Sequence, residues 1–272
     1  MIKFFRKIHI KKFALLYISL VIMDSGISQE IVKSETVSLN GVKTYYEVYG
    51  KGEPLLLLHG WGQSSKYWLP YISDFHEDFE VYLVDLQGHG RSEILDPNWS
   101  INSVANNLND LIEYLELDRI KSIGLSYGGD VLFQLAVINP IVIESMIIIG
   151  AIGTWDAKEN PDYIEYFSYS NLDNLSDMKV FQTSGNQLRA ILDHFENYTV
   201  ELSDDQLKNI QSKTLIILGD DDDSIPIEEV SRARKNLPES DLWILPNSPH
   251  KAHEGKNKEE FIRVSKSFLK ER

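Results

Sequence analysis

The sequence predicts an α/β protein: a mostly parallel central sheet with helices on both faces. Short apolar runs without polar alternation occur at residues 55–58, 81–84, 120–125 and 146–149, and segments of helical length separate them. Strands of a parallel sheet have this pattern because helices cover both of their faces. The chain of 272 residues, 43% hydrophobic and 25% charged, is long enough for one large α/β domain with an insertion.

A hairpin is expected before the parallel strands. Residues 35–39 and 43–49 alternate between apolar and polar side chains around Asn40-Gly41, a pair that favours a tight turn between antiparallel strands. The remaining expected elements are helices at residues 64–75, 101–117, 127–138, 227–236 and 258–270, and strands at residues 214–218 and 241–245.

Residues 151–213 interrupt the alternation of strands and helices. This interval contains no strand-like apolar run, and a stretch of that length without structure is uncommon inside a compact domain. We therefore expect a small helical insertion at 151–213 and a core formed by residues 29–150 and 214–272. The aromatic residues of the insertion are Trp155, Tyr163, Tyr166, Phe167, Tyr169, Phe181, Phe195 and Tyr198.

The N-terminus has the layout of a secretory signal peptide. Five basic residues precede an apolar run at residues 13–23, and Gly26 and Ser28 supply small residues before a cleavage site. The run is shorter than the roughly 20 residues that span a bilayer, so no stable membrane insertion is expected once residues 1–28 are removed. The prediction is a secreted or periplasmic protein; an uncleaved membrane anchor and a merely basic N-terminus are the alternatives.

Charge and cysteine content exclude several classes of protein. The chain has 41 acidic and 27 basic residues and a formal net charge of −14, and removal of residues 1–28 makes it still more acidic. Such a surface repels nucleic acid and anionic lipid. The absence of cysteine from the sequence excludes disulfides, thiol catalysis and thiolate metal ligands. No feature of the sequence indicates a particular oligomeric state.

A G-x-S-x-G pentapeptide lies at the junction between an expected strand and an expected helix. It reads Gly124-Leu125-Ser126-Tyr127-Gly128. A serine between two glycines at such a junction is held on a sharp, strained turn with its hydroxyl exposed, as a nucleophile requires. Because the pentapeptide alone also occurs by chance, the interpretation depends on the other residues that a serine nucleophile needs.

A serine hydroxyl is a poor nucleophile at neutral pH and needs a base and a group that orients the base. His250 follows the strand at 241–245 and is the candidate base; a surface histidine in a loop is the alternative. Four consecutive carboxylates at residues 220–223 follow the strand at 214–218 and supply the orienting acid, or else form a solvated turn or an adventitious cation site. The spacing does not match an EF-hand, so no designed calcium site is expected.

Backbone amides for an oxyanion hole are expected at two turns. His59-Gly60-Trp61-Gly62 ends the strand at 55–58, and Tyr127 directly follows the serine. The amides of Trp61 and Tyr127 can both point at a developing alkoxide, whereas a turn needed only for packing is the alternative. The glycines of residues 85–92 indicate another tight turn, in which His89 is expected to be structural.

Together these residues resemble the α/β-hydrolase fold enzymes. The order serine, aspartate, histidine along the chain is that of this family and differs from the best-known serine proteases. The resemblance extends from about residue 35 to residue 272. Its motifs, in order, are His59-Gly60, Asp85-x-x-Gly88-His89-Gly90-x-Ser92, the turn around Ser126, Gly219-x-x-Asp222-x-x-x-Pro226 and His250.

The resemblance implies roles for further residues. Asp222 becomes the orienting acid, with Asp221 and Asp223 as alternatives, and the insertion at 151–213 becomes a helical cap over the site. The aromatic side chains expected to shape a substrate pocket under this cap are Trp61, Trp155, Tyr166 and Phe167.

One residue departs from the family pattern. Many relatives carry glycine directly before the histidine, whereas Pro249 precedes His250 here. Proline fixes its own φ at about −65°, has no N–H and restricts the residue before it. A different path of this loop would make His253 a competitor for the role of base.

The sequence predicts a serine hydrolase that cleaves a small-molecule carboxylic ester or lactone with an apolar part. Ser126 forms an acyl-enzyme, His250 transfers protons and Asp222 orients the imidazole, so no metal or organic cofactor is required. A carbon–carbon bond hydrolase or a perhydrolase on the same three residues is an alternative, because the His-Gly-Trp-Gly turn resembles that of carbon–carbon hydrolases in the family. A non-catalytic protein that binds an apolar ligand is a further alternative.

Overall fold

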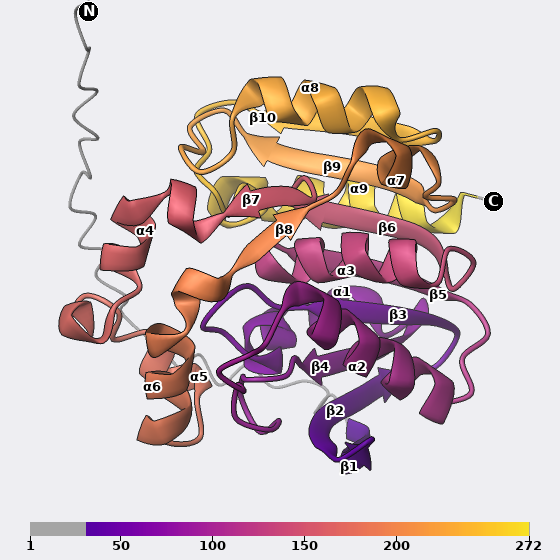
Figure 1. The fold of residues 1–272 in the computed structure, drawn as a ribbon. Coiled ribbons are helices and arrows are strands. Elements are labelled where there is room, and N and C mark those ends of the chain that lie inside the picture. Colours follow the sequence, from indigo (N-terminus) through magenta and orange to yellow (C-terminus); the bar gives the residue numbers. More distant parts are fainter. Residues whose placement is uncertain (1–30, 272) are drawn as a thin grey trace, which may run out of the picture.

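The computed structural model describes residues 31–271, so the predicted signal peptide at residues 1–28 lies outside the described residues. This part of the chain has the α/β fold with a mostly parallel sheet that the sequence predicts (Figure 1). Its strands are β1 (Ile31–Leu39), β2 (Val42–Gly50), β3 (Glu53–Leu58), β4 (Phe79–Asp85), β5 (Ile120–Leu125), β6 (Ile143–Ile149), β7 (Thr154–Asp156), β8 (Thr199–Glu201), β9 (Lys213–Gly219) and β10 (Ser240–Leu245).

Within the described residues, eight of these strands form one sheet in the order β1-β2-β4-β3-β5-β6-β9-β10. In this order, β4, β3, β5, β6, β9 and β10 run parallel to one another, and β2 is antiparallel to both β1 and β4. The predicted hairpin around Asn40-Gly41 is confirmed: Leu39 pairs with Val42, and both turn residues have positive φ. Because these six strands are parallel, their carboxyl ends meet at one edge of the sheet.

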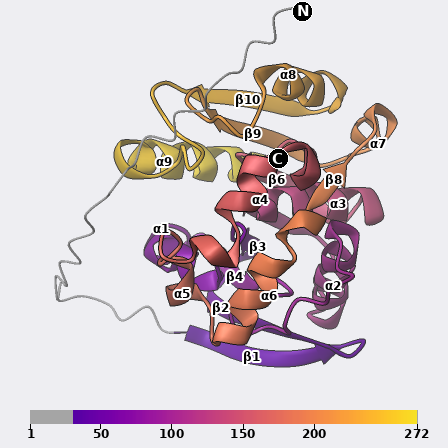
Figure 2. The same cartoon turned by 60° about the vertical axis from the view of Figure 1, so that its left-hand side comes forward.

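Helices cover both faces of the sheet. They are α1 (Ile72–Phe75), α2 (Ile101–Tyr114), α3 (Tyr127–Ile138), α4 (Pro161–Tyr166), α5 (Met178–Phe181), α6 (Gly185–Asp193), α7 (Asp204–Lys208), α8 (Ile227–Asn236) and α9 (Lys258–Lys270). Figures 1 and 2 show α2, α3 and α8 on one face and α1 and α9 on the other. Among residues 31–271, no helix is both long enough and apolar enough to cross a membrane.

Each face of the sheet has its own apolar core. On one side, Leu108 of α2, Val131 of α3 and Val230 of α8 are buried against the sheet. On the other, Phe75 of α1 and Phe261 of α9 are buried. The runs of apolar residues in the central strands are therefore buried on both faces, which is why they show no alternation.

The first expected helix, at residues 64–75, differs from the structure. It is a 3₁₀ helix at Ser65–Tyr71 followed by the short helix α1. Pro70 lies inside the 3₁₀ part. A proline has no N–H to donate to a preceding carbonyl, so the regular α-helical ladder is not formed there.

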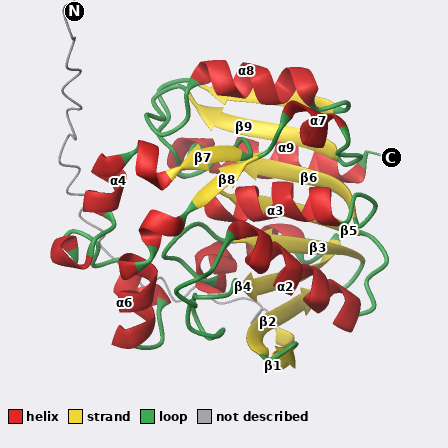
Figure 3. Ribbon diagram, in the orientation of Figure 1, coloured by secondary structure: helices red, strands yellow, loops and turns green. Residues whose placement is uncertain are grey.

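The segment between β6 and β9 contains short elements: β7, α4, α5, α6, β8 and α7 (Figure 3). The sequence predicts helices here; the antiparallel pairing of β7 with β8 is an addition. Figure 1 shows α4, α5 and α6 beyond the edge toward which β9 and β10 point. Gln182, just after α5, ties the segment to this edge: its amide donates to the Gly62 carbonyl (2.8 Å) and accepts from the Gly90 amide (2.9 Å).

The turn from β5 into α3 is built from a strained serine and two close-packed glycines. Ser126 has φ 51° and ψ −117°, a conformation that costs a non-glycine residue about 1–3 kcal/mol. A Cβ on Gly124 would lie 2.6 Å from the Gly128 carbonyl oxygen, and a Cβ on Gly128 would lie 2.6 Å from the Leu58 carbonyl oxygen. The start of α3 therefore packs directly on the backbones of β3 and β5.

We predict that Gly128→Ala destabilises the protein, because the added methyl group collides with the backbone at the end of β3. The expected loss in the free energy of unfolding is about 1–3 kcal/mol. Gly185→Ala is the matched control, since a Cβ at Gly185 meets nothing within 4 Å; it should be neutral or slightly stabilising. Urea unfolding followed by tryptophan fluorescence measures both, and equal stabilities of the two variants would contradict this account of the turn.

Candidate active site

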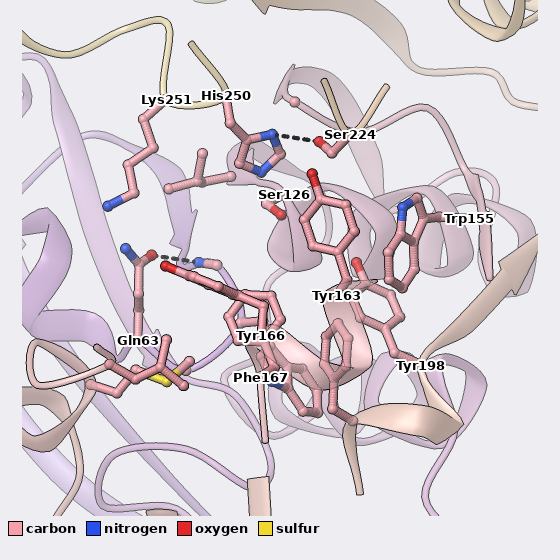
Figure 4. A pocket seen from close by; sticks show the side chains of 18 of the residues that line it. Gln63, Ser126, Trp155, Tyr163, Tyr166, Phe167, Tyr198, Ser224, His250 and Lys251 are labelled. Carbon is pink, nitrogen blue, oxygen red and sulfur yellow. Dashed lines mark hydrogen bonds between the residues drawn. The ribbon is translucent and has the colours of Figure 1, made fainter. Parts of the chain in front are cut away.

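A cavity of about 490 Å³ lies between the carboxyl ends of the strands and the segment that joins β6 to β9 (Figure 4). Ser126 and His250 both line it, and Figure 4 shows them at the same end. Of the candidate pocket residues, Trp61, Trp155, Tyr166 and Phe167 all line the cavity. Tyr169, an aromatic residue of the same segment, instead lies in contact with Arg189 on the surface.

An aspartate and a hydroxyl hold the His250 imidazole. Asp222 Oδ2 lies 2.7 Å from His250 Nδ1, and Ser224 Oγ lies 3.1 Å from the same nitrogen. The Ser224 hydroxyl and its backbone amide also donate to Asp222 Oδ1, at 2.6 and 3.0 Å. A carboxylate in this position can only accept, so Nδ1 carries the proton and Nε2 is left as the basic nitrogen.

The environment of Asp222 keeps it ionised. Burial alone raises the pKa of this carboxyl, but the hydrogen bonds and charge of His250 and the hydrogen bonds from Ser224 outweigh it, so the net pKa lies below the ordinary value. Its side chain is fully buried, whereas the exposed Asp223 accepts a hydrogen bond from Tyr163. Among the four consecutive carboxylates, Asp222 is the one that contacts the imidazole within the described residues.

Gly150, at the end of β6, brings the imidazole close to the serine turn. A Cβ at this position would lie 2.8 Å from His250 Cε1, so only glycine lets the ring approach so closely. Gly150 directly follows Ile149, which pairs with Leu125, and Ile149 accepts a hydrogen bond from the Ser126 amide (2.7 Å). In residues 31–271 the Ser126 hydroxyl makes no hydrogen bond; such contacts often tighten only when substrate is bound.

His253 lies away from the cavity. It is fully buried, its Nε2 contacts the Tyr67 hydroxyl at 2.9 Å, and its ring packs on Trp68 and Phe261. Burial, with the nearby charges of Lys251 and His250, lowers the pKa of His253 to about 3. A residue so placed is a neutral core histidine.

Pro249 does not remove His250 from the site. The loop before the histidine is fixed to the acidic turn by backbone groups: the Asp221 amide donates to the Ser248 carbonyl (3.0 Å), and the Ser248 amide donates to Asp220 Oδ1 (3.2 Å). These bonds use the residue before the proline. The missing N–H of Pro249 is therefore not needed to hold the loop.

His59 fixes the turn after β3. The Leu86 amide donates to His59 Nε2 (3.1 Å), so this nitrogen is unprotonated and Nδ1 carries the hydrogen that faces the Gly60 carbonyl at 2.9 Å. Burial lowers the pKa of His59, in keeping with the neutral ring. Gln63 Oε1 accepts from the Gly60 amide at 2.9 Å and so closes the same turn (Figure 4).

The turn at residues 85–92 is structural. Asp85 is fully buried and accepts hydrogen bonds from the Ser65 amide (2.7 Å) and the Arg91 amide (2.8 Å). His89 is also fully buried, packs against Trp61 and Tyr127, and does not line the cavity. Burial holds the pKa of His89 well below its ordinary value, as expected for a neutral packing residue.

Sequence reasoning missed a buried carboxylate in the cavity wall. Asp130 of α3 is 4% exposed; the Gly153 amide donates to its Oδ1 (3.1 Å) and the Tyr198 hydroxyl to its Oδ2 (2.6 Å). Burial raises the pKa of Asp130 to about 6, although these bonds and the charge of His250 oppose the shift. Like Ser224, Asp130 acquires its partners only through folding, because they lie on other elements or across a turn.

Asp130 should make the stability of the protein depend on pH. Because its folded pKa of about 6 exceeds the unfolded value of about 3.9, the folded state binds the proton more tightly. Stability from this group is present below pH 4 and is lost as the pH rises through 6. The free energy of unfolding of Asp130→Asn, compared with that of the natural protein, should therefore rise by about 2 kcal/mol between pH 4 and pH 7. Urea unfolding at several pH values measures this, with the exposed Asp177→Asn as control; a constant difference at every pH would contradict it.

Known proteins are similar to this chain in sequence and in fold. The family described as "alpha/beta hydrolase fold" matches residues 53–168. The chain is 34% identical over 125 residues to a soluble epoxide hydrolase from Corynebacterium sp. (strain C12), a match that covers 46% of this chain. The match covers 43% of that enzyme, so this chain spans less than half of its length.

Other similarities extend over most of the chain. It is 24% identical over 262 residues to a 2-hydroxy-6-oxo-2,4-heptadienoate hydrolase from Pseudomonas putida, covering 86% of this chain and 95% of that one. The crystal structure of naproxen esterase (carboxylesterase NP) from Bacillus subtilis matches with a TM-score of 0.70 and 21% identity, covering 87% of this chain and 91% of that one. The serine turn lies inside the family match and the fold is shared along the chain, so this protein has the α/β-hydrolase fold.

Proposed function

We propose that this protein is a serine hydrolase that cleaves a carboxylic ester or lactone through an acyl-enzyme on Ser126. The observation that carries the proposal is the contact between Asp222 Oδ2 and His250 Nδ1 at 2.7 Å, beside a cavity that Ser126 also lines. A buried carboxylate that fixes the tautomer of an imidazole next to a strained serine is the arrangement that activates a hydroxyl nucleophile.

In the proposed first half-reaction, Ser126 Oγ attacks the carbonyl carbon and its proton moves to His250 Nε2. Asp222 stays ionised and stabilises the imidazolium that forms, because its net pKa is already lowered. The tetrahedral intermediate then breaks its bond to the alcohol oxygen, which takes the proton from Nε2. The product is an ester of the acyl group with Ser126.

Backbone amides stabilise the oxyanion in this proposal. Tyr127 is the first residue of α3, where an amide has no partner within the helix. In the described residues no acceptor is present for the Trp61 amide, whereas the neighbouring Gly60 and Gln63 amides are used within the turn. One such donor contributes about 3–4 kcal/mol to transition-state stabilisation.

In the second half-reaction, water attacks the acyl carbon, gives a proton to His250 Nε2 and displaces Ser126 Oγ, which recovers that proton. The acid leaves and the starting state is restored. The chain itself supplies the nucleophile, the proton carrier and the oxyanion donors, so the proposal requires neither a metal nor an organic cofactor.

The aromatic walls of the cavity favour a substrate with an apolar part. Trp155, Tyr163, Phe167, Phe195 and Tyr198 of the segment between β6 and β9 all line it. We propose that this segment acts as the cap over the site and selects the substrate. We also propose that the chain is exported, on the strength of the sequence of residues 1–28.

A carbon–carbon bond hydrolase is the second candidate, because the Pseudomonas putida relative is a heptadienoate hydrolase. A substrate of that class carries a carboxylate. No arginine lines the cavity among the described residues, and its single lysine, Lys251, is exposed. The ester or lactone proposal therefore fits the charge of the cavity better. Epoxide hydrolysis is disfavoured, because relatives with that chemistry use a carboxylate nucleophile and this chain has a serine at position 126.

We predict that a fluorophosphonate probe labels Ser126 in the purified protein and that short p-nitrophenyl esters are hydrolysed. Ser126→Ala should abolish labelling and lower kcat by at least about 10⁴-fold, since the residual rate comes from binding and the oxyanion donors alone. Mass spectrometry of the labelled peptide identifies the residue. Absence of both labelling and turnover would falsify the proposed hydrolase function and would favour a binding protein with the same fold.

We predict different effects for the two nearby histidines. His250→Ala should lower kcat by about 10⁴-fold or more, because the proton carrier is lost. His253→Ala should lower the free energy of unfolding through lost packing with Trp68 and Phe261, while the folded fraction keeps kcat within about tenfold. Steady-state kinetics normalised to folded protein separates the two. An active His250→Ala protein beside an inactive His253→Ala protein would reverse the assignment of the base.

A further inference from the structure

Asp130 places a carboxylate in the cavity wall one helical turn from the nucleophile. Its backbone amide donates to the Ser126 carbonyl at 3.0 Å, so the two side chains start from adjacent turns at the beginning of α3. Asp130 is 4% exposed and nevertheless lines the same cavity as Ser126 and His250. A group on a substrate bound at Ser126 can therefore reach it.

The carboxylate of Asp130 keeps acceptor capacity. Each of its oxygens accepts one hydrogen bond, Oδ1 from the Gly153 amide and Oδ2 from the Tyr198 hydroxyl. A carboxylate has about four lone-pair directions, so each oxygen retains a free one. Within residues 31–271, no lysine or arginine forms an ion pair with Asp130. A buried carboxylate without a cation is costly, and a neutral amide would serve equally well for packing alone.

The rest of the cavity shares this negative character. Asp162, Asp177 and Asp223 also line it, and Lys251 is the only lysine or arginine among its described lining residues. The Lys251 ammonium lies over the Tyr67 ring at 5.4 Å and 3.9 Å from Glu254, so part of its charge is already engaged. Acceptors and negative charge therefore dominate the polar part of an otherwise aromatic pocket.

We propose that Asp130 is a specificity-determining residue: its carboxylate accepts a hydrogen bond from a hydroxyl or ammonium group of the substrate, and it disfavours substrates that carry a carboxylate. The proposal rests on the serine hydrolase function proposed above. It narrows the substrate class to an apolar ester or lactone with a hydrogen-bond donor within reach of one turn of α3. Tyr198 positions the carboxylate through its hydroxyl.

The test compares esters of matched shape. 2-Hydroxyethyl butanoate is paired with propyl butanoate, and ethyl 3-hydroxybutanoate with ethyl 3-methylbutanoate, so that a hydroxyl replaces a methyl group in either half of the molecule. Two further esters carry a charge: the butanoate ester of N,N-dimethylethanolammonium and that of 3-hydroxypropanoate. Each is compared with the uncharged 3-methylbutyl butanoate. The first comparison measures the preference for an ammonium group, and the second measures the discrimination against a carboxylate. kcat/KM is measured for each with the natural protein, Asp130→Asn, Tyr198→Phe and the control Asp118→Asn, an exposed aspartate that does not line the cavity.

The expected ratio of kcat/KM for the better donor ester over its methyl partner is roughly 10- to 100-fold in the natural protein, as for a hydrogen bond to a charged group. Asp130→Asn should reduce this ratio to about one and improve the carboxylate ester, because the amide can donate. Tyr198→Phe should lower the ratio without abolishing it, since the carboxylate remains but loses the hydroxyl that positions it. Asp118→Asn should keep the ratio of the natural protein.

Several outcomes would overturn the proposal. If the natural protein shows no preference for any donor ester, or if Asp130→Asn slows all esters by one common factor, Asp130 is structural. Failure of the serine hydrolase function is distinguished by the absence of fluorophosphonate labelling at Ser126. If labelling occurs but the esters react too slowly for kcat/KM to be measured, the test uses labelling instead. Butylammonium, 1-butanol and butanoate are compared by how strongly each slows the labelling of Ser126. Equal protection by the three compounds, or the same order in Asp130→Asn, would then exclude a role in recognition.

Discussion

The close approach of α3 to β3 and β5 is the constraint on which the rest of the site depends. Gly124 and Gly128 allow the helix to begin against two strand backbones, and this contact holds Ser126 at a positive φ. The same turn begins α3 at Tyr127, whose amide has no partner within the helix, and starts the helix that carries Asp130 one turn later. The serine, one proposed oxyanion donor and the proposed recognition residue are thus set by a single packing contact.

Burial affects the pKa values of the buried histidines and aspartates in different ways, according to whether a partner compensates for lost hydration. His59 and His253 are buried beside hydrogen-bond partners that suit a neutral ring, and burial lowers the pKa of both. Asp222 is buried beside a histidine and a hydroxyl that donate to it, and its net pKa is lowered. Asp130 receives hydrogen bonds but no cation, and its pKa rises. Desolvation acts on all four, so the partner decides the charge state at neutral pH.

The core of the fold could be predicted from sequence because its signals are local and long. The helices at 127–138, 227–236 and 258–270 match the structure, since each has sustained helical periodicity over nine or more residues. The segment between β6 and β9 could not be predicted in detail. Its two strands have three residues each, and Gln182, elsewhere in the segment, is held by contacts with distant turns. In the site, Ser126, Asp222 and His250 belong to recognisable motifs. Ser224 and Asp130 do not, and their importance follows from contacts that folding creates.

The walls of the cavity come from two sources with different physical roles. The core supplies rigid groups at strand ends and at the start of α3, and the segment between β6 and β9 supplies most of the aromatic surface. The hydrogen bond between Tyr198 and Asp130 joins the two parts inside the cavity, where low exposure makes a charged acceptor strong. An aromatic wall favours apolar substrates of many shapes, whereas a fixed carboxylate requires a donor at one place. Selectivity in such a pocket therefore follows from the position of Asp130 relative to Ser126, which the first turn of α3 determines.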